Sequence, residues 1–201
     1  MSDQVLQWLA LHWVEVAGTL LGITYVFLSI RQNILTWLLG LLTSLLYIYV
    51  FFSSKFYADM VLQVYYVWVS IYGWILWSKG KKTGHGREEL PVTLLSVKEA
   101  WRLLLVALIL WLGIFAVLKY YTDSPVPFGD AFTTAFSIVA TWMLARKILE
   151  HWIVWIVVDF VSLILYLYKG LYPTSVMFVI YTAAAWWGYV EWKRSRKKQA
   201  A

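Results

Sequence analysis

Apolar residues in this chain form seven long, uninterrupted stretches. They cover residues 14–30, 34–52, 58–77, 100–118, 128–145, 152–168 and 172–192. Each stretch is about 17 to 22 residues long, which is the length that an α-helix needs to cross the hydrocarbon core of a bilayer. Soluble helices instead repeat a polar face at every turn. The pattern therefore predicts an all-α integral membrane protein with seven transmembrane helices, in a single transmembrane domain over residues 1–201.

Composition agrees with a membrane protein. Of the 201 residues, 62% are apolar and only 14% are charged, which is too few charges for the surface of a soluble domain of this size. The chain has no Cys, so thiol catalysis, disulfides and thiolate metal sites are excluded. The first 18 residues contain no Lys or Arg and are interrupted by Glu15, so we expect this segment to be retained rather than cleaved as a signal peptide.

Positive charges divide unevenly between the two sides of the predicted membrane. Of the 17 Lys and Arg residues, only Lys55, Lys119 and Lys169 lie on one side, and the others lie on the side of residues 78–99 and the basic tail 193–201. Under the positive-inside rule, this second side is cytoplasmic, with the C-terminus inside and the N-terminus outside. Membrane topology then explains the net charge of +6. We expect a multi-pass protein of the inner membrane, with lipid as a partner and no nucleic acid.

The sequence also predicts an internal repeat. When the chain is shifted by 115 residues without a gap, the three helices of residues 14–77 match those of residues 128–192. The shift pairs Thr19 with Thr134, Arg31 with Arg146, Trp37 with Trp152, Tyr57 with Tyr172, Tyr66 with Tyr181, Gly73 with Gly188 and Trp77 with Trp192. The helix at 100–118 is then a linker whose single crossing gives both repeats the same orientation, and residues 78–99 form a cytoplasmic loop. Parallel repeats of this kind occur in transporters, whose substrate site lies near the midplane between the copies.

One stripe of the sixth predicted helix carries polar and aromatic side chains. Helical spacing places Trp152, Trp155, Asp159, Ser162 and Tyr166 on one face, while Val and Leu residues occupy the other. Asp159 is the one acid well inside a predicted span. An ionised carboxylate in hydrocarbon is costly enough to make such a residue a functional candidate. The alternative is a structural Asp that is capped by hydroxyls or amides of neighbouring helices.

Other predicted helices add hydroxyl, amide and small side chains. The sets are Asp59, Gln63, Tyr66, Ser70, Gly73 and Trp77 in the third helix, Thr134, Ser137 and Thr141 in the fifth, and Gly18, Thr19, Gly22 and Tyr25 in the first. Each residue alone also fits ordinary helix packing. Together they predict an aromatic cavity with few charges. Such a cavity suits a flat, polar or cationic ring, because stacking and cation–π contacts contribute about 0.5 to 2 kcal/mol each.

The sequence carries no enzyme signature. No Ser lies in a G-x-S-x-G motif, no P-loop is present, and His12, His85 and His151 are too scattered for a metal site. We therefore expect no catalysis, no cofactor and no metal, and facilitated diffusion rather than transport driven by nucleotide hydrolysis. A membrane enzyme and a non-transporting receptor or scaffold remain alternatives. The apolar helix faces permit a homo-oligomer.

Three segments, residues 54–77, 128–159 and 166–176, resemble the PnuC-type vitamin transporters, which include nicotinamide riboside carriers and the PnuT thiamine carriers. The likeness covers nearly the whole chain. Trp152 and Trp155 match the W-x-x-W motif that the family associates with substrate binding. The resemblance implies two parallel three-helix repeats joined by a fourth helix, a 3+1+3 arrangement similar to SWEET sugar transporters. It also implies energy-independent uptake, with trapping when a cytoplasmic kinase or pyrophosphokinase modifies the vitamin.

Two positions of the resemblance bear on the substrate. Nicotinamide riboside carriers tend to have Gln where Thr141 stands and Asn where His151 stands, and amides at such sites discriminate substrates strongly. Together with residues 123–135, these differences are similar to the thiamine branch, so thiamine is favoured and nicotinamide riboside is second. Both vitamins carry a fixed positive charge on an aromatic ring. We expect Trp152, Trp155, Tyr166, Tyr66 and Trp37 to stack on or gate the ring, and Gln63, Thr141, Ser162 and Asp159 to meet its polar groups.

Overall fold

Helices dominate the computed structural model, which describes residues 20–53, 57–83 and 86–199. The predicted start of the first helix, with Gly18 and Thr19, lies outside these residues. The described helices are Leu20–Ile30, α2 (Leu35–Ser53), α3 (Tyr57–Lys79), α4 (Val97–Tyr121), α5 (Pro127–Ala145), α6 (His151–Tyr168) and α7 (Tyr172–Gln199). The seven helices confirm the predicted all-α fold. Where both are described, their bounds lie within a few residues of the apolar stretches, except that α7 continues to Gln199.

Most of these helices have the length and composition of membrane spans. The segment Met60–Lys79 of α3 and all of α4, α5 and α6 are long and apolar enough to cross a bilayer, while Leu20–Ile30 and Leu35–Tyr49 are shorter apolar helices. Many large apolar side chains on the bundle stay exposed, among them Leu46, Ile109 and Ile164. Exposed apolar surface of this extent fits contact with lipid rather than with water.

The segment between α3 and α4 differs from the predicted loop. Gly80 ends α3 with a φ of 58°, a left-handed conformation that favours glycine. A short hairpin follows, in which β1 (Lys81–Thr83) pairs antiparallel with β2 (Gly86–Glu88). At the other end of the chain, α7 continues through the basic segment that the sequence predicts as a separate tail. Lys and Arg have high helix propensities, and their positive charges near the C-terminus interact favourably with the negative end of the helix dipole.

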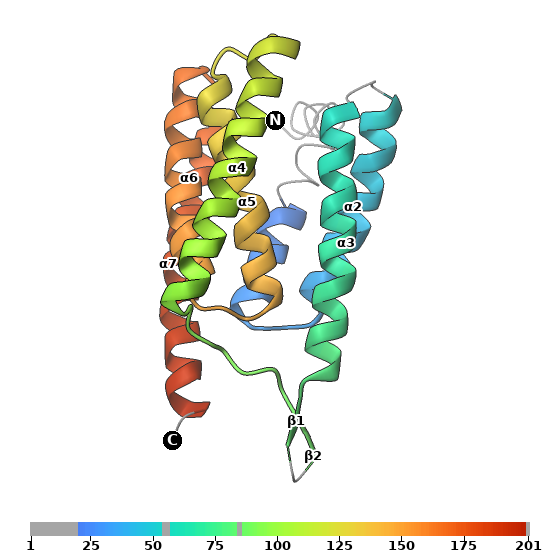
Figure 1. Ribbon diagram of the computed structural model, residues 1–201, viewed down its shortest axis with the longest axis vertical. Helices are drawn as coiled ribbons and strands as arrows, with labels where there is room; N and C mark the ends of the chain where they lie inside the picture. The colour runs from blue at the N-terminus through green and yellow to red at the C-terminus, as the bar shows by residue number, and fades with distance from the viewer. Residues whose placement is uncertain (1–19, 54–56, 84–85, 200–201) are drawn as a thin grey trace, which may run out of the picture.

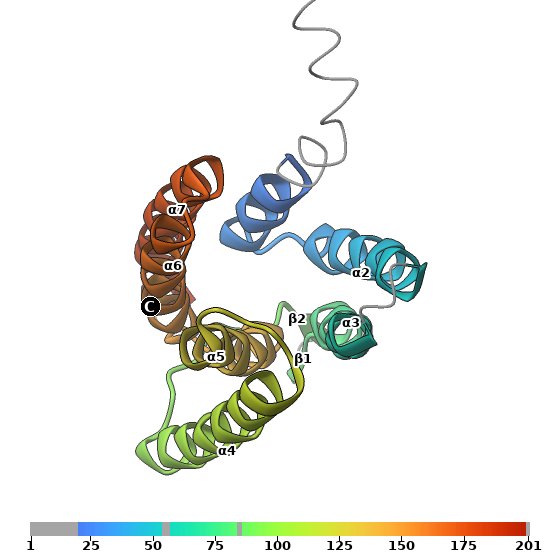
Figure 2. The same cartoon turned by 90° about the horizontal axis from the view of Figure 1, so that it is seen from above.

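The helices form two groups that run in the same directions. In Figures 1 and 2, Leu20–Ile30, α2 and α3 lie on one side of the bundle, α5, α6 and α7 lie on the other, and α4 lies outside against α5. The first and third members of each group run toward the end that carries β1 and β2, and the second member runs away from it (Figure 1). We call this end, with the α5–α6 turn and the last residues of α7, the hairpin end.

Glycine positions 115 residues apart make matching contacts in the two groups. A Cβ added to Gly73 of α3 would overlap the indole of Trp37, and one added to Gly188 of α7 would lie 2.6 Å from the indole of Trp152. Only glycine therefore lets each indole pack flat against the neighbouring helix. These contacts support the repeat, which remains a prediction.

Candidate functional site

A hollow space lies between the two helix groups. It consists of two adjoining hollows of about 230 and about 280 Å³, which share Gly22, Tyr25 and Trp155 in their walls. We treat them as two halves of one central cavity, the Asp159 half and the Gln63 half, each named after one wall residue. Gly22 and Tyr25 come from the first helix and Trp155 from α6, so both groups contribute to the boundary between the halves.

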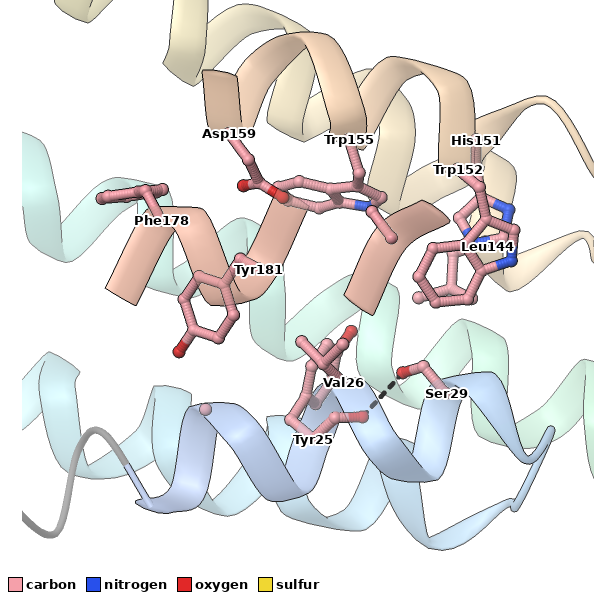
Figure 3. A pocket seen from close by; sticks show the side chains of 12 residues that line it. Tyr25, Val26, Ser29, Leu144, His151, Trp152, Trp155, Asp159, Phe178 and Tyr181 are labelled. Carbon is pink, nitrogen blue, oxygen red and sulfur yellow. Dashed lines mark hydrogen bonds between the residues drawn. The ribbon is translucent and has the colours of Figure 1, made fainter. Parts of the chain in front are cut away.

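The Asp159 half is aromatic and carries one formal charge. Trp152, Trp155 and Asp159 of α6 line it together with Phe178 and Tyr181 of α7, as Figure 3 shows. Asp159 is only 5% exposed, and among the described residues no Lys, Arg or His forms an ion pair with it. A buried carboxylate without a counter-ion is costly, so this wall is complementary to a ligand that brings a positive charge.

The Gln63 half is richer in hydroxyl and amide groups. Its polar wall residues are Thr43, Ser44 and Tyr47 of α2, Gln63, Tyr66 and Ser70 of α3, and Thr141 of α5. Thr141 Oγ1 donates to the backbone oxygen of Ser137 at 2.7 Å, so its donor is used and its lone pairs remain free to accept. This half can therefore bind the uncharged polar part of a ligand whose ring lies in the Asp159 half.

The structure brings six of the predicted site residues into the walls of this cavity: Trp152, Trp155, Asp159, Gln63, Tyr66 and Thr141. Trp37, Ser162 and Tyr166 do not line either half. Trp37 is buried against Gly73 and meets the ring of Trp77 edge to face at 5.4 Å. Tyr166 stacks on Phe178 at 5.1 Å, so it supports a wall residue from behind. Their part in binding stays a prediction.

The length of α6 explains why its predicted stripe extends beyond the cavity. Ser162 is buried near the far end of the stripe, and Tyr166 lies one turn further on. From Trp152 to Tyr166 a helix rises by about 21 Å, since each residue adds about 1.5 Å. A cavity for one small molecule is shorter than that. Helical periodicity thus identifies the face of α6 that points to the cavity. The structure is needed to tell which residues along that face reach it.

Some residues that line the cavity were not predicted from the sequence. Phe178 belongs to a helix in which aromatic residues are common, and sequence alone does not separate it from a side chain that faces lipid. Tyr181 could have been predicted, because the repeat pairs it with the predicted site residue Tyr66. The two tyrosines line opposite halves of the cavity. Gly22 faces Tyr181 so closely that a Cβ there would overlap the phenol oxygen. The first helix and α7 therefore meet tightly across the Asp159 half.

His151 closes the Asp159 half toward the hairpin end. It is fully buried, and its ring lies 4.5 Å from the ring of Trp152 and 4.7 Å from that of Trp192. Its Nδ1 lies 2.7 Å from the backbone oxygen of Ile148. Since a carbonyl oxygen only accepts, Nδ1 carries the proton, and in the neutral ring Nε2 is an acceptor.

Comparisons with known proteins point to one family. Residues 12–194 match the model of the family described as nicotinamide mononucleotide transporter. The chain is 26% identical over 215 residues to the nicotinamide riboside transporter PnuC of Escherichia coli (strain K12), covering 95% of this chain and 89% of that protein. It is 28% identical over 188 residues to the riboflavin/roseoflavin transporter RibM of Streptomyces davaonensis, covering 92% and 87%. The crystal structure of the vitamin B3 transporter PnuC matches with a TM-score of 0.74 at 25% identity, over 98% of this chain and 87% of that one.

Proposed function

The chain belongs to the nicotinamide mononucleotide transporter family, and from this premise we propose that it carries a cationic aromatic vitamin by facilitated diffusion, with thiamine as the favoured substrate. It is a multi-pass membrane transporter of vitamins rather than an enzyme, as its relatives are. The proposal concerns which vitamin it carries, how the cavity holds it and what drives net uptake.

The observation that carries the proposal is the buried carboxylate of Asp159 in an aromatic wall. Among the described residues that line the two halves, Asp159 is the one with a formal charge. A thiazolium or pyridinium ring brings the missing positive charge and a flat face for stacking on Trp155. The remaining part of the vitamin, an aminopyrimidine or a ribose, would then lie in the Gln63 half among hydroxyls and the amide. The neutral ring of riboflavin lacks this charge match.

Two wall positions favour thiamine over nicotinamide riboside. Thr141 lines the Gln63 half and His151 the Asp159 half. The resemblance implies amides at these two positions in the nicotinamide riboside carriers. A site that lacks these amides loses partners that a carboxamide or ribose needs. Nicotinamide riboside remains the alternative, because relatives over nearly the whole length of the chain are named as its transporters.

Net uptake by this route needs consumption of the vitamin inside the cell. The sequence holds no nucleotide-hydrolysis motif. We therefore propose that phosphorylation or pyrophosphorylation in the cytoplasm traps the vitamin, and that the hairpin end faces the cytoplasm. The basic residues of the α5–α6 turn and of the last turns of α7 support this orientation.

A binding titration separates the candidate substrates. The purified protein contains 14 Trp residues, so quenching of their fluorescence reports binding. Thiamine, nicotinamide riboside and riboflavin are titrated side by side, with thiamine expected to bind at least about tenfold more tightly than the others, a difference of about 1.4 kcal/mol. Tighter binding of nicotinamide riboside would select the alternative. Tighter binding of riboflavin would contradict the charge argument itself.

A further inference from the structure

The hairpin end of the bundle is closed beneath the central cavity by two tryptophans, one from each helix group. Trp77 lies in the last turn of α3 and Trp192 about two turns before the end of α7, and their rings are 6.3 Å apart. Both belong to a buried cluster with Ile30, Ala145 and Trp152. The ring of Trp192 contacts those of Trp152 and His151, which line the Asp159 half. A substrate that leaves through this end therefore has to pass this packed cluster.

Each indole donates a hydrogen bond to the opposite helix group. Trp77 Nε1 donates to the backbone oxygen of Ala145 at 3.0 Å, and Ala145 ends α5. Trp192 Nε1 donates to the backbone oxygens of Ser29 and Ile30 at 3.1 and 3.2 Å, and Ile30 ends the first helix. The last carbonyls of a helix have no partner within it, so an indole N–H satisfies them. Ile30 and Ala145 are 115 residues apart, as are Trp77 and Trp192, and the two contacts are therefore reciprocal.

A third contact joins the turns that follow those helix ends. Lys147 Nζ donates to Gln32 Oε1 at 3.0 Å, and these residues are also 115 positions apart. Gln32 and Lys147 have φ angles of 53° and 52°, left-handed conformations that end helices but strain a side chain-bearing residue. The ammonium of Lys147 lies 4.6 Å from the ring centre of Trp77, so the same residue touches the indole contact.

The closed arrangement also leaves some buried polar atoms without hydrogen-bond partners. Within the described part of the chain, the buried Nε1 atoms of Trp37 and Trp152 and the buried Nε2 of His151 have no hydrogen-bond partner. Buried polar groups without partners lose the hydration that an opened end would restore. The closure is thus held by a few hydrogen bonds and opposed by unsatisfied groups around it. A gate requires such a balance, because both of its states must be reachable.

From this geometry we propose that Trp77 and Trp192 form a symmetric latch at the hairpin end, in which each indole N–H holds the C-terminal carbonyl of the first helix in the other group. A rocking motion of one group against the other breaks both contacts together. The latch rests on the proposed transport function, since it gives substrate an exit, but not on which vitamin is carried.

Removal of the indole N–H tests the latch. Trp77→Phe and Trp192→Phe keep an aromatic ring and remove only the donor. Because the chain has no Cys, an introduced Ala145→Cys is a unique reporter at a buried position of the closed end. Labelling by a membrane-impermeant thiol reagent from the hairpin side, without any vitamin, should become at least about threefold faster in each Phe variant. Trp101→Phe is the matched control, because Trp101 is an exposed residue of α4 away from the latch. Unchanged labelling in both latch variants, or equal acceleration in the control, overturns the proposal.

Cross-linking provides a second test that does not depend on the stability of the Phe variants. A Gln32→Cys, Lys147→Cys double variant is treated with a short, reducible bifunctional thiosulfonate. Cross-linking should abolish vitamin flux in proteoliposomes and leave fluorescence-detected binding intact, and reduction should restore flux. Full flux through cross-linked protein refutes the latch. If the parent carries none of the vitamins while the labelling responds as expected, the proposed substrate fails and the latch stands.

Discussion

The carboxylate of Asp159 is buried four residues beyond Trp155 on the same face of α6, without a cation to pair with among the described residues. This placement is the reason for proposing a charged ring, rather than a neutral one, as the ligand of the cavity. Of the two interpretations available from sequence, a functional acid and a capped structural one, the position of Asp159 in the cavity wall supports the first.

Asp159→Asn should weaken binding of a cationic vitamin at least about tenfold, which corresponds to about 1.4 kcal/mol, because the amide keeps the shape and loses the charge. The affinity for a neutral ring such as riboflavin should change much less. Fluorescence titration of the purified variant measures both. Glu191→Gln is the matched control, since Glu191 is a partly exposed acid of α7 that pairs with Arg194. Equal binding of the cation by Asp159→Asn would mean that the carboxylate does not meet the charge.

The two tryptophans of the W-x-x-W motif have different surroundings. Trp155 lines both halves of the cavity, whereas Trp152 is 3% exposed and packs on Gly188. Trp155→Ala should sharply reduce uptake, by about tenfold or more, with membrane insertion intact, because it removes a stacking face. Trp152→Ala should reduce uptake and also lower stability, since truncating a buried Trp costs about 3 to 5 kcal/mol.

Initial uptake rates, normalised to the amount of inserted protein, measure these effects. Trp186→Ala is the control, because Trp186 is an exposed residue of α7. If Trp155→Ala transports as well as the parent, the boundary between the two halves is not part of the substrate site.

At the scale of the helices, close packing of indoles on glycines sets the distance between neighbours in each group. Gly73→Ala and Gly188→Ala should each lower the stability by about 1 to 3 kcal/mol, because the added methyl overlaps the ring of Trp37 or Trp152. Gly113→Ala on α4 meets no atom within 4 Å and should be neutral or stabilising by about 1 kcal/mol. Thermal unfolding in detergent compares the three variants. If Gly188→Ala unfolds at the same temperature as the parent, the indole of Trp152 can move away from the added methyl at no cost in stability.

The helices were predictable because the thickness of a bilayer fixes the length of an apolar stretch. Trp155 and Asp159 were predictable as neighbours because the helical period puts them on one face. The β1–β2 hairpin was not, since strands of three residues carry no apolar pattern. Trp37 shows the other limit: its position in the repeat matches Trp152, yet it lies in the packing of α2 on α3, because the repeat relation does not say which copy faces the cavity.

For the molecule as a whole, trapping in the cytoplasm requires the hairpin end to be the exit, and we propose that this end faces the cytoplasm. Burial lowers the pKa of Lys147 in the α5–α6 turn, with Glu89 acting in the opposite direction, so this is a buried basic group close to an acidic one. The exposed basic residues at the end of α7 support the proposed orientation more directly.

Lys198→Cys places a unique thiol in that segment, since the chain has no other. In a bacterial host, an impermeant reagent should label it only after the inner membrane is permeabilised. Labelling in intact cells with an opened outer membrane would show that the protein has the opposite orientation to the proposed one.

In the proposed transport cycle, a cationic aromatic vitamin enters the cavity between the two helix groups and leaves on the other side without an energy source. Counterflow measures this directly. Proteoliposomes are loaded with unlabelled thiamine and diluted into a trace of labelled thiamine, with no ion gradient and no nucleotide. We expect a transient accumulation of label that depends on the protein and is lost in Trp155→Ala. Binding of thiamine in detergent without any exchange of label, or exchange that requires an ion gradient, would contradict it.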